Sequence, residues 1–374
     1  MAFLNKNIAL ATAALVACGT AAATEDYDLR YAPGIGGADM SAPFEGGWVF
    51  QIPAYVYSGN IRTTTNTMPT DISTALGQPA GSGLLYASAA VRSNTQMNVS
   101  GLLPRLSFMS AQTFLGATIG GTVLLPLVRK SSSVSLTSLT PSLSGPAAAG
   151  LTPTQVGQIY AAIGPAATAQ ALAVTDGNSN KSTGIGDLEF SPILRWSTEA
   201  TQTLFIMTVV TPTGKYDKTL AANPSAGHFY TFRPAVQFSY IGDGWDVGSR
   251  LAYSYNTRNN ESHYRSGNYI NVDLTAMKSI SESTRIGLSG YGVSQLTRDS
   301  TNLSATDFLA QGAVIAARQQ ATLGQKGHVY GIGPEYAYIH GAGDYLLEGR
   351  LMKEFGSETR PKGFTGVVTL SKPF

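Results

Sequence analysis

The chain alternates apolar and polar side chains over many short segments. Residues 229–241 show the pattern clearly: every second side chain from Tyr230 to Tyr240 is aromatic or apolar, and those between are polar or small. A period of two residues is typical of a β-strand with one apolar face. The same alternation returns along most of the chain after residue 46, so the sequence predicts an all-β protein.

Twelve segments are predicted to be strands, and a count of fourteen stays open. Most have the ~9–11 residues that a tilted strand needs to cross the hydrocarbon layer of a membrane. Several contain a proline, where a bulge or a strand end is expected because proline cannot donate a ladder hydrogen bond. The segments are residues 47–57, 95–108, 116–128, 185–197, 203–211, 229–241, 245–255, 269–278, 284–296, 328–340, 345–355 and 364–374.

The connections between these segments alternate in length. Long connections cover residues 58–94, 129–184, 212–228, 256–268 and 297–327. After each long connection and the strand that follows it, the next connection is short. Long loops on one side and tight turns on the other are the layout of an outer-membrane barrel. A soluble β-sandwich also fits the alternation of side chains, but it has no reason to sort its loops by length. We therefore predict a transmembrane antiparallel up-and-down β-barrel with long extracellular loops and short periplasmic turns.

The last strand ends on an aromatic residue. Its apolar face is expected to close against the first strand and to serve as the assembly signal read by the barrel-assembly machinery. That face consists of Phe364, Gly366, Val368, Leu370 and Phe374.

The N-terminus has the order of a secretory signal: Lys6 in a short first region, an apolar run over residues 8–17, and small residues before Thr24. Cleavage after Ala23 leaves residues 24–45 as a periplasmic tail or a plug, and residues 46–374 as the barrel. In a second reading, Cys18 is a lipidated N-terminus, since residues 15–18 fit a lipoprotein processing site.

Composition narrows the class of protein further. Charged residues make up 13% of the chain, against roughly 25% in typical soluble domains. After the leader, no run of ~20 apolar residues predicts a membrane helix. The net charge of +2 is too small to indicate a nucleic-acid-binding surface. We expect a monomer in the outer membrane of a Gram-negative cell, surrounded by outer-membrane lipids.

The polar faces of the predicted strands are expected to line the lumen. Their charges have both signs, which fits either a network of ion pairs that fills the barrel or a pore whose charges set selectivity. The candidates are Asp187, Glu189, Arg195, Arg233, Gln237, Asp246, Arg250, Asn271, Asp273, Glu335, Glu348 and Arg350. Two alanine-rich stretches, residues 152–174 and 307–323, are helix-compatible within the long loops. They are expected to be frayed helical turns or a cover over the pore mouth.

The sequence gives little support for catalysis or for metal binding. The four histidines show no paired spacing, the leader holds the single cysteine, and no G-x-S-x-G motif occurs. The glycine-rich run Gly34-Ile35-Gly36-Gly37 lacks the βαβ context of a phosphate cradle. We expect no metal, no cofactor and no enzymatic activity, with a rim-active hydrolase as the remote alternative.

One motif resembles a known family. Residues 185–188 read Ile-Gly-Asp-Leu, and the stretch after residue 211 carries Pro212, Thr213, Gly214, Tyr216 and Asp217. With residues 333–336 and the terminal Phe374, they resemble the outer-membrane protein family linked to the meta-cleavage pathway of phenol degradation. The resemblance implies a barrel related to channels for fatty acids and aromatic hydrocarbons, and passive entry of small hydrophobic or aromatic compounds. From the residues alone, the motif reads as a rim turn needed for folding. A structural or surface-interaction barrel with a closed lumen is the alternative function.

Overall fold

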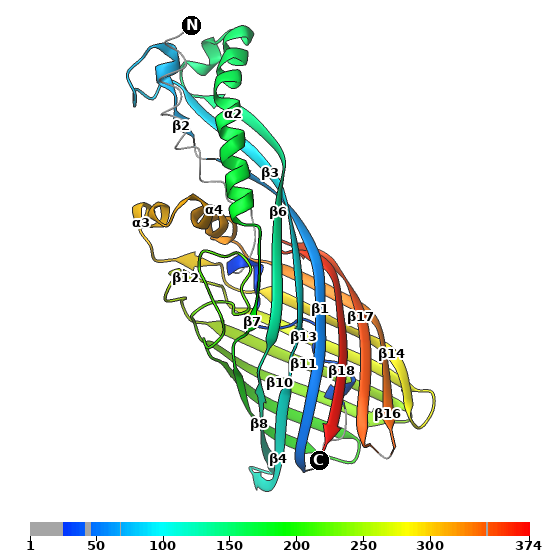
Figure 1. Ribbon diagram of the computed structural model, residues 1–374. Coiled ribbons are helices and arrows are strands. Elements are labelled where there is room, and N and C mark those ends of the chain that lie inside the picture. Colours follow the sequence, from blue (N-terminus) through cyan, green and yellow to red (C-terminus); the bar gives the residue numbers. More distant parts are fainter. Residues whose placement is uncertain (1–24, 42–45, 68, 342) are drawn as a thin grey trace.

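The computed structural model describes residues 25–41, 46–67, 69–341 and 343–374. Their strands form a closed antiparallel barrel, in which the last strand pairs with the first (Figure 1). When segments that continue one another across a break are counted as one, the barrel has twelve strands. The predicted fold class and strand count are confirmed. The predicted leader and Cys18 lie outside the described residues.

Three of the twelve strands are interrupted, and the other nine are continuous apart from local bulges. The interrupted ones are β3 (Tyr86–Leu102) with β4 (Arg105–Phe114), β5 (Ala117–Leu124) with β6 (Leu127–Ser144), and β7 (Asn180–Ile185) with β8 (Glu189–Ser197). The continuous ones are β1 (Gly47–Asn66), β9 (Thr201–Val210), β10 (Thr231–Gly242), β11 (Trp245–Asn256), β13 (Tyr269–Ser279), β14 (Thr284–Gln295), β16 (His328–His340), β17 (Tyr345–Glu358) and β18 (Lys362–Pro373).

Short elements lie in the loops and in the N-terminal segment. The 3₁₀ turns are η2 (Glu25–Tyr27), η3 (Ala38–Met40), η4 (Ser73–Leu76) and η5 (Ala148–Gly150). The helices are α2 (Pro153–Gly177), α3 (Ala305–Ala310) and α4 (Ala313–Thr322), and the two-residue strands are β2 (Thr70–Asp71), β12 (Tyr264–Arg265) and β15 (Ser300–Thr301). None of the described helices is long and apolar enough to span a bilayer.

The barrel closes through the chain's first and last strands. Ala54 of β1 stands opposite Val368 of β18, and the register continues from Val49 to Asn60. At the short-turn end, the amide of Phe374 donates to the carbonyl of Trp48 at 3.0 Å. The two strands therefore leave no free edge on either side of the seam, which is what a membrane-spanning sheet requires.

The outer surface is apolar and the interior is polar, the reverse of a soluble protein. On the outward faces, Val56 is 55% exposed, Phe190 52% and Leu251 53%. On the inward faces, Asp273, Glu348 and their neighbours are almost fully buried. Alternate residues along one strand therefore face different solvents, hydrocarbon on one side and the packed lumen on the other.

The three strands are interrupted at one level, along a line of prolines: Pro104 and Pro126 lie in two of the breaks, and Pro53 lies beside them within the continuous strand β1. The amide of Leu103 donates to the Pro53 carbonyl (2.9 Å), that of Leu125 to Pro104 (3.1 Å) and that of Gly186 to Pro126 (2.8 Å). Each proline lacks an amide hydrogen, so the regular ladder cannot pass through this level. Below the line, β4, β5 and β8 stay in the barrel wall. Above it, β3, β6 and β7 rise beyond the barrel with the upper part of β1 (Figure 1).

Not every proline has this effect. Pro126 ends a strand segment as expected, but Pro192, Pro234 and Pro334 lie within β8, β10 and β16 without interrupting them.

The raised strands form an extension where the sequence predicted a loop. Strand β6 runs to Ser144, and its register with β3 extends to Tyr86. Its alternating residues there are mainly Ser and Thr against Val and Leu, a pattern that looks like a polar loop because neither face meets lipid. Helix α2 packs on the inner side through Ile159 and Ile163.

Helix α2 is also more regular than expected. It begins at a capping box between Thr152 and Gln155 and continues through Pro165, where the sequence suggested a break. Burial of one side of the helix, including Ala167 and Ala171, stabilises it across the proline.

Neighbouring residues of β9 allow a test of which face meets lipid. Phe205 is 40% exposed on the outer surface, whereas Ile206 borders a cavity inside the barrel. Phe205→Arg is expected to lower the free energy of unfolding by ~2–4 kcal/mol, because the charge enters hydrocarbon near mid-strand. Ile206→Arg should cost clearly less. Urea titration of refolded protein, followed by heat-modifiable gel mobility, measures both. Equal losses at the two positions would contradict this orientation.

Candidate functional site

All twelve residues predicted to line the lumen face the barrel interior. Asp187 comes from the break between β7 and β8, and the others come from strands. Glu189, Arg195 and Arg250 are half-buried and the remaining nine are buried. They are not spread along an open pore, because much of the interior is occupied by the chain's own N-terminal segment. Their part in selectivity stays a prediction.

That segment, residues 25–41, is called the strap here. It runs inside the barrel from the long-loop end toward the short-turn end, as far as the middle of β10. At its start, the Glu25 amide donates to Ser266 Oγ at 3.0 Å. Midway, the Tyr31 hydroxyl donates to Asp273, and at its end Gln237 donates to the Met40 carbonyl at 2.9 Å. The strap therefore contacts loop and wall residues along its whole described length.

One half of the interior is filled by the strap. Tyr31 and Ile35 pack into a buried cluster with Tyr291, Met352 and Val367 of the wall. The glycine-rich run permits this close approach: a Cβ on Gly37 would lie 1.3 Å from the guanidinium of Arg350. These glycines therefore serve packing of the strap against the wall.

Buried charges beside the strap are paired. Arg350 lies 3.2 Å from Glu348 and 3.5 Å from Glu335, and it also donates to the strap carbonyl of Ile35 at 3.2 Å. Asp39 of the strap forms an ion pair with Arg105. A buried charge without a partner is costly, so these contacts tie the strap to the wall.

The family-like motif forms a wedge at the break between β7 and β8. Asp187 accepts hydrogen bonds from the Gly214 amide (3.1 Å) and from Ser225 Oγ (2.8 Å), and Thr213 accepts from the Leu188 amide (3.0 Å). A Cβ on Gly214 would lie 2.5 Å from the backbone carbon of Gly186. Only glycine lets the motif loop approach the broken strand this closely. Pro212 precedes this contact, and Asp217 accepts from the Thr219 amide at 2.8 Å within the following loop.

The same motif holds the strap through Arg30. Its guanidinium lies 3.0 Å from Asp187, donates to the carbonyls of Gly227 and Phe229, and stacks on the Phe229 ring at 3.9 Å. Tyr216 reaches the strap's first residue, since its hydroxyl lies 3.4 Å from Glu25. The motif is therefore both a closure for the broken strand and a socket for the strap.

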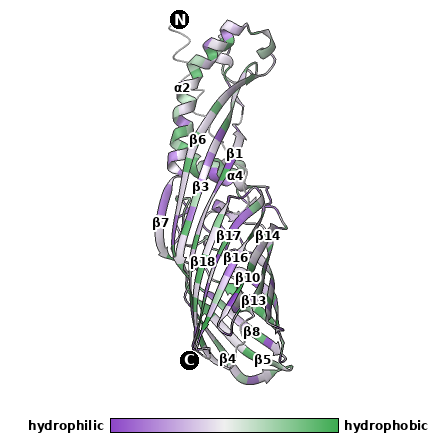
Figure 2. Ribbon diagram, turned by 90° about the vertical axis from the view of Figure 1, so that its right-hand side faces the viewer, coloured by the Kyte–Doolittle hydropathy of each residue, from purple (hydrophilic) through white to green (hydrophobic). Residues whose placement is uncertain are grey.

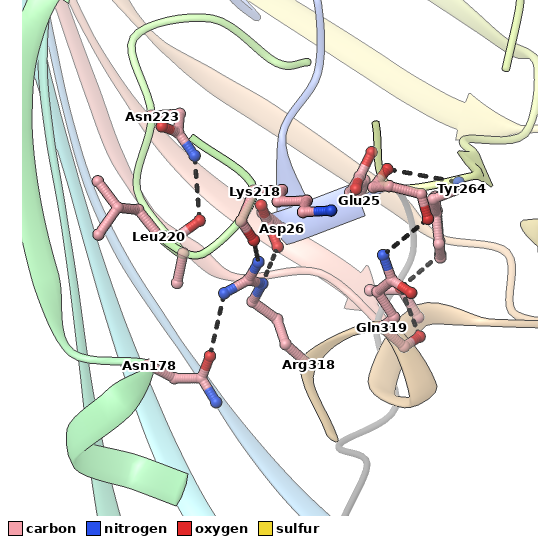
Figure 3. A network of polar contacts seen from close by, with 12 residues as sticks. Glu25, Asp26, Asn178, Lys218, Leu220, Asn223, Tyr264, Arg318 and Gln319 are labelled. Carbon is pink, nitrogen blue, oxygen red and sulfur yellow. Dashed lines mark hydrogen bonds and ion pairs between the residues drawn. The ribbon is translucent and has the colours of Figure 1, made fainter. Parts of the chain in front are cut away.

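A second network holds the strap at the long-loop end (Figure 3). Arg318 of α4 forms an ion pair with Asp26 at 2.6 Å and donates to Asn178 at the end of α2 (3.4 Å) and to the carbonyls of Lys218 and Thr219. One arginine thus joins the strap to two helices and to the motif loop. The two helix-compatible stretches are therefore ordered helices that Arg318 joins to the strap, and their role as a cover over a pore mouth stays a prediction.

Burial in this network changes the acidity of two strap carboxyls. Desolvation, reinforced by the neighbouring Asp26 charge, raises the pKa of Glu25 to about 7. Desolvation also raises the pKa of Asp26 to about 6, against the opposing effect of Arg318. Both groups are therefore easier to bury protonated than charged.

The other half of the interior is hollow. A cavity of ≈ 280 Å³ lies between the strap and the wall on the side of β1 to β11, at the level of the proline line. Its lining is mainly apolar by area, but it also includes charged residues such as Arg30, Glu189 and Arg233. The apolar residues include Leu103, Leu124, Val128, Ile193, Ile206 and Val210. This cavity is called the chamber here.

A smaller cavity of ≈ 60 Å³ lies nearer the long loops, beneath α2 and α4. Tyr27 of the strap lines both cavities. The described residues thus enclose two adjoining spaces between the extension and the barrel interior.

Comparison with known proteins identifies the family. The model of the family described as "Putative MetA-pathway of phenol degradation" matches residues 76–370. The chain belongs to this family. The resemblance carried by the motif is therefore confirmed, and the motif's contacts show how family members with these residues can close a broken strand.

Solved structures support the fold. The COG4313 outer membrane channel from Pseudomonas putida F1 aligns with a TM-score of 0.55 at 14% identity, over 90% of this chain and 98% of that one. The CymD monoaromatic hydrocarbon channel aligns with a TM-score of 0.38 at 10% identity, over 96% of this chain and 98% of that one. The first likeness shows the outer-membrane barrel fold, and the second is too distant to carry an argument. Among curated proteins, none matches this sequence.

The sequence left residues 24–45 open as a periplasmic tail or a plug, and it did not single out Arg30, Tyr31 or Arg318. Arg30 and Tyr31 lie in an irregular stretch without periodicity, so nothing local marks them as buried. Arg318 lies in a helix that reads as an exposed loop element. One signal was available. Inward-facing charges that find no partner on the wall need one from another segment, which indicates that some part of the chain enters the lumen.

The motif wedge predicts a strong effect of one methyl group. Gly214→Ala places a Cβ against backbone that cannot move aside and is expected to cost ~1–3 kcal/mol of stability. Gly349→Ala in β17 is the matched control, because a Cβ there meets nothing within 4 Å. Urea midpoints of the two variants measure the difference. A Gly214→Ala midpoint equal to that of Gly349→Ala would contradict the wedge.

The strap's attachment is expected to weaken as the pH rises. Burial raises the pKa of Glu25 to about 7, so its protonated form suits the closed network, and this contribution is complete below the ordinary Glu value of 4.5. The contribution is lost as the pH rises through about 7, when Glu25 ionises, whereas ionised Asp26 keeps its ion pair with Arg318. Hydrogen exchange of strap amides, corrected for intrinsic rates, should show less protection at pH ~8 than at pH ~5. Glu25→Gln should flatten this dependence, and an unchanged profile in that variant would rule out Glu25 as its source.

Proposed function

We propose that this protein is an outer-membrane channel for passive uptake of small hydrophobic or aromatic compounds. The chamber is the observation that carries the proposal. An apolar cavity of ≈ 280 Å³ inside a barrel with a lipid-facing exterior is unusual for a water-filled pore. A dry cavity of about 150 Å³ is enough to bind benzene, so the chamber has room for a substituted single ring.

Family membership supports the aromatic class of solute. The family's description refers to phenol degradation, and the solved barrel with the same overall fold is described as a channel. Polar groups also line the chamber: the Tyr57 hydroxyl donates to Glu354 at 3.1 Å, and its oxygen can accept a further hydrogen bond from a solute hydroxyl while the apolar wall accepts the ring. A phenolic compound satisfies both kinds of surface.

We also infer a route and a plug. Solute enters from the side of the long loops through the smaller cavity, passes Tyr27, and reaches the chamber beside the strap. The strap fills the remaining interior, so its displacement controls how freely solute leaves toward the periplasm. Arg30 in its socket is the contact that resists this displacement most directly, because it joins an ion pair to two carbonyl hydrogen bonds.

Uptake into proteoliposomes tests the proposal. Wild-type protein is expected to admit phenolics faster than protein-free vesicles, with alkanes and fatty acids as comparison solutes. Ile206→Trp should reduce phenol uptake several-fold because the indole fills the chamber. Phe205→Trp, the neighbouring residue on the lipid face, is the matched control and should leave uptake unchanged.

The same uptake assay also tests whether the strap acts as a plug. Arg30→Ala should raise uptake by loosening the strap, whereas Arg62→Ala, an exposed residue on β1, should not. Uptake of phenolics at the protein-free level in every form of the protein would overturn the channel and favour a structural or surface-interaction barrel with a closed lumen.

A further inference from the structure

The outward face of the extension changes abruptly from apolar to polar. Leu102, Leu127 and Ile185 stand side by side on β3, β6 and β7, and all three are more than 40% exposed. Two residues farther along β3, β6 and β7, the facing row is Ser100, Arg129 and Thr183, whereas on β1 the apolar surface continues one row higher through Val56, opposite Ser100, before Ser58. Two residues span ~7 Å of strand, so the boundary between the two surfaces is sharp. It marks the upper limit of the apolar belt on this side of the barrel.

Above the boundary lies an ordered row of small polar side chains. Ser58, Asn98, Ser131 and Lys181 occupy adjacent positions on β1, β3, β6 and β7. Ser58 donates to Asn98 Oδ1 at 2.8 Å, and Asn98 donates to Ser131 Oγ at 3.4 Å. Gln96 from the next row donates to Ser58 at 3.1 Å. The bonds hold amides and hydroxyls in a flat array that can still accept and donate toward an outside ligand.

The charge of this face has one sign. The four strands that form it contain no Asp or Glu. Arg62, Arg92, Arg129 and Lys181 are exposed on it, and none of them has an ion pair among the described residues. The inward Lys130, one residue from Arg129, pairs with Asp28. Cations on the inside are thus neutralised by the protein, and those on the outside are left for another partner.

We propose that this face binds the phosphorylated headgroup of an outer-leaflet glycolipid. Arg129 and Lys181 contact phosphate, and the row of Ser58, Asn98 and Ser131 contacts sugar hydroxyls. Guanidinium groups bind phosphate through paired hydrogen bonds, and amide and hydroxyl arrays suit sugars. The position decides for a lipid over a soluble partner, because the patch continues directly from the belt. This inference rests on the outer-membrane placement in the proposed function, and it does not depend on the solute.

The extension gives the contact a structural purpose. Its strands β1, β3 and β6 rise past the belt as a continuous sheet, and β7 beside them is largely hydrophilic (Figure 2). A bare sheet at this height would otherwise have to solvate four unpaired cations beside an anionic leaflet. Headgroup binding stabilises the extension upright over the two cavities.

Binding of lipopolysaccharide to the refolded full chain in detergent tests the proposal. Arg129→Gln with Lys181→Gln should weaken binding at least tenfold, since two cations near an anionic surface are lost. The control, Lys278→Gln with Lys372→Gln, removes two exposed cations at the short-turn end and should bind like wild type. Dephosphorylated lipopolysaccharide should bind wild type as weakly as the native lipid binds the first variant.

Three outcomes would overturn the inference. They are equal binding by the two double variants, equal binding of native and dephosphorylated lipid, and no measurable binding by wild type. Heat-modifiable gel mobility verifies that each variant is folded. Phenol uptake in vesicles free of lipopolysaccharide is measured separately, so loss of headgroup binding and loss of channel function are told apart.

Discussion

The cost of burying charge governs this structure. A barrel that turns its apolar side chains to lipid must turn its polar ones inward, where water is scarce. Arg350 can remain there because Glu335, Glu348 and the strap carbonyl of Ile35 surround it. Conversely, Arg30 of the strap forms the ion pair that Asp187 of the wall needs. Strap and wall each supply charged partners that the other lacks, so neither the strap nor the wall would be stable in the same form alone.

The line of prolines is the second constraint, and the family motif answers it. Breaking three strands at one level leaves the edge of β7 without a strand beyond it, a position that natural proteins cover. Here the motif loop covers it: the Lys215 amide donates to the Ile185 carbonyl at 2.9 Å, and Asn180 bonds to Ala221 and Ala222. The break also draws side chains apart behind it, at the level where the chamber lies. One irregularity therefore connects the motif, the socket for Arg30 and the cavity.

The two halves of the interior have different physical characters. On one side, the aromatic and aliphatic side chains around Tyr31 and Tyr291 pack as in a soluble core. On the other, comparable apolar residues line an unfilled space. Since the strap separates them, a modest shift of the strap exchanges packed surface for open surface. Arg30 in its socket holds the strap against such a shift, together with the ion pairs of Asp26 with Arg318 and of Asp39 with Arg105.

The sequence by itself determined the barrel and its strand count. Both follow from the period of two and from the loop lengths, which can be read without knowing any contact between distant residues. The twelve candidate residues lie at inward-facing positions, but their role in lining a pore stays a prediction. The helix-compatible character of residues 152–174 and 307–323 was also readable, because an alanine-rich composition is a local property.

Only the tertiary structure decided what fills the barrel. The strap has no periodicity, and its partners in the rest of the chain range from Arg105, 66 residues from Asp39, to Arg360, 333 residues from Tyr27. The raised sheet of β3 and β6 was hidden for a related reason, since strands outside lipid lose the apolar face that reveals strands within it. The chamber is the feature that is hardest to predict from the sequence. A cavity forms where side chains from distant segments fail to fill a space, and no residue type marks that place.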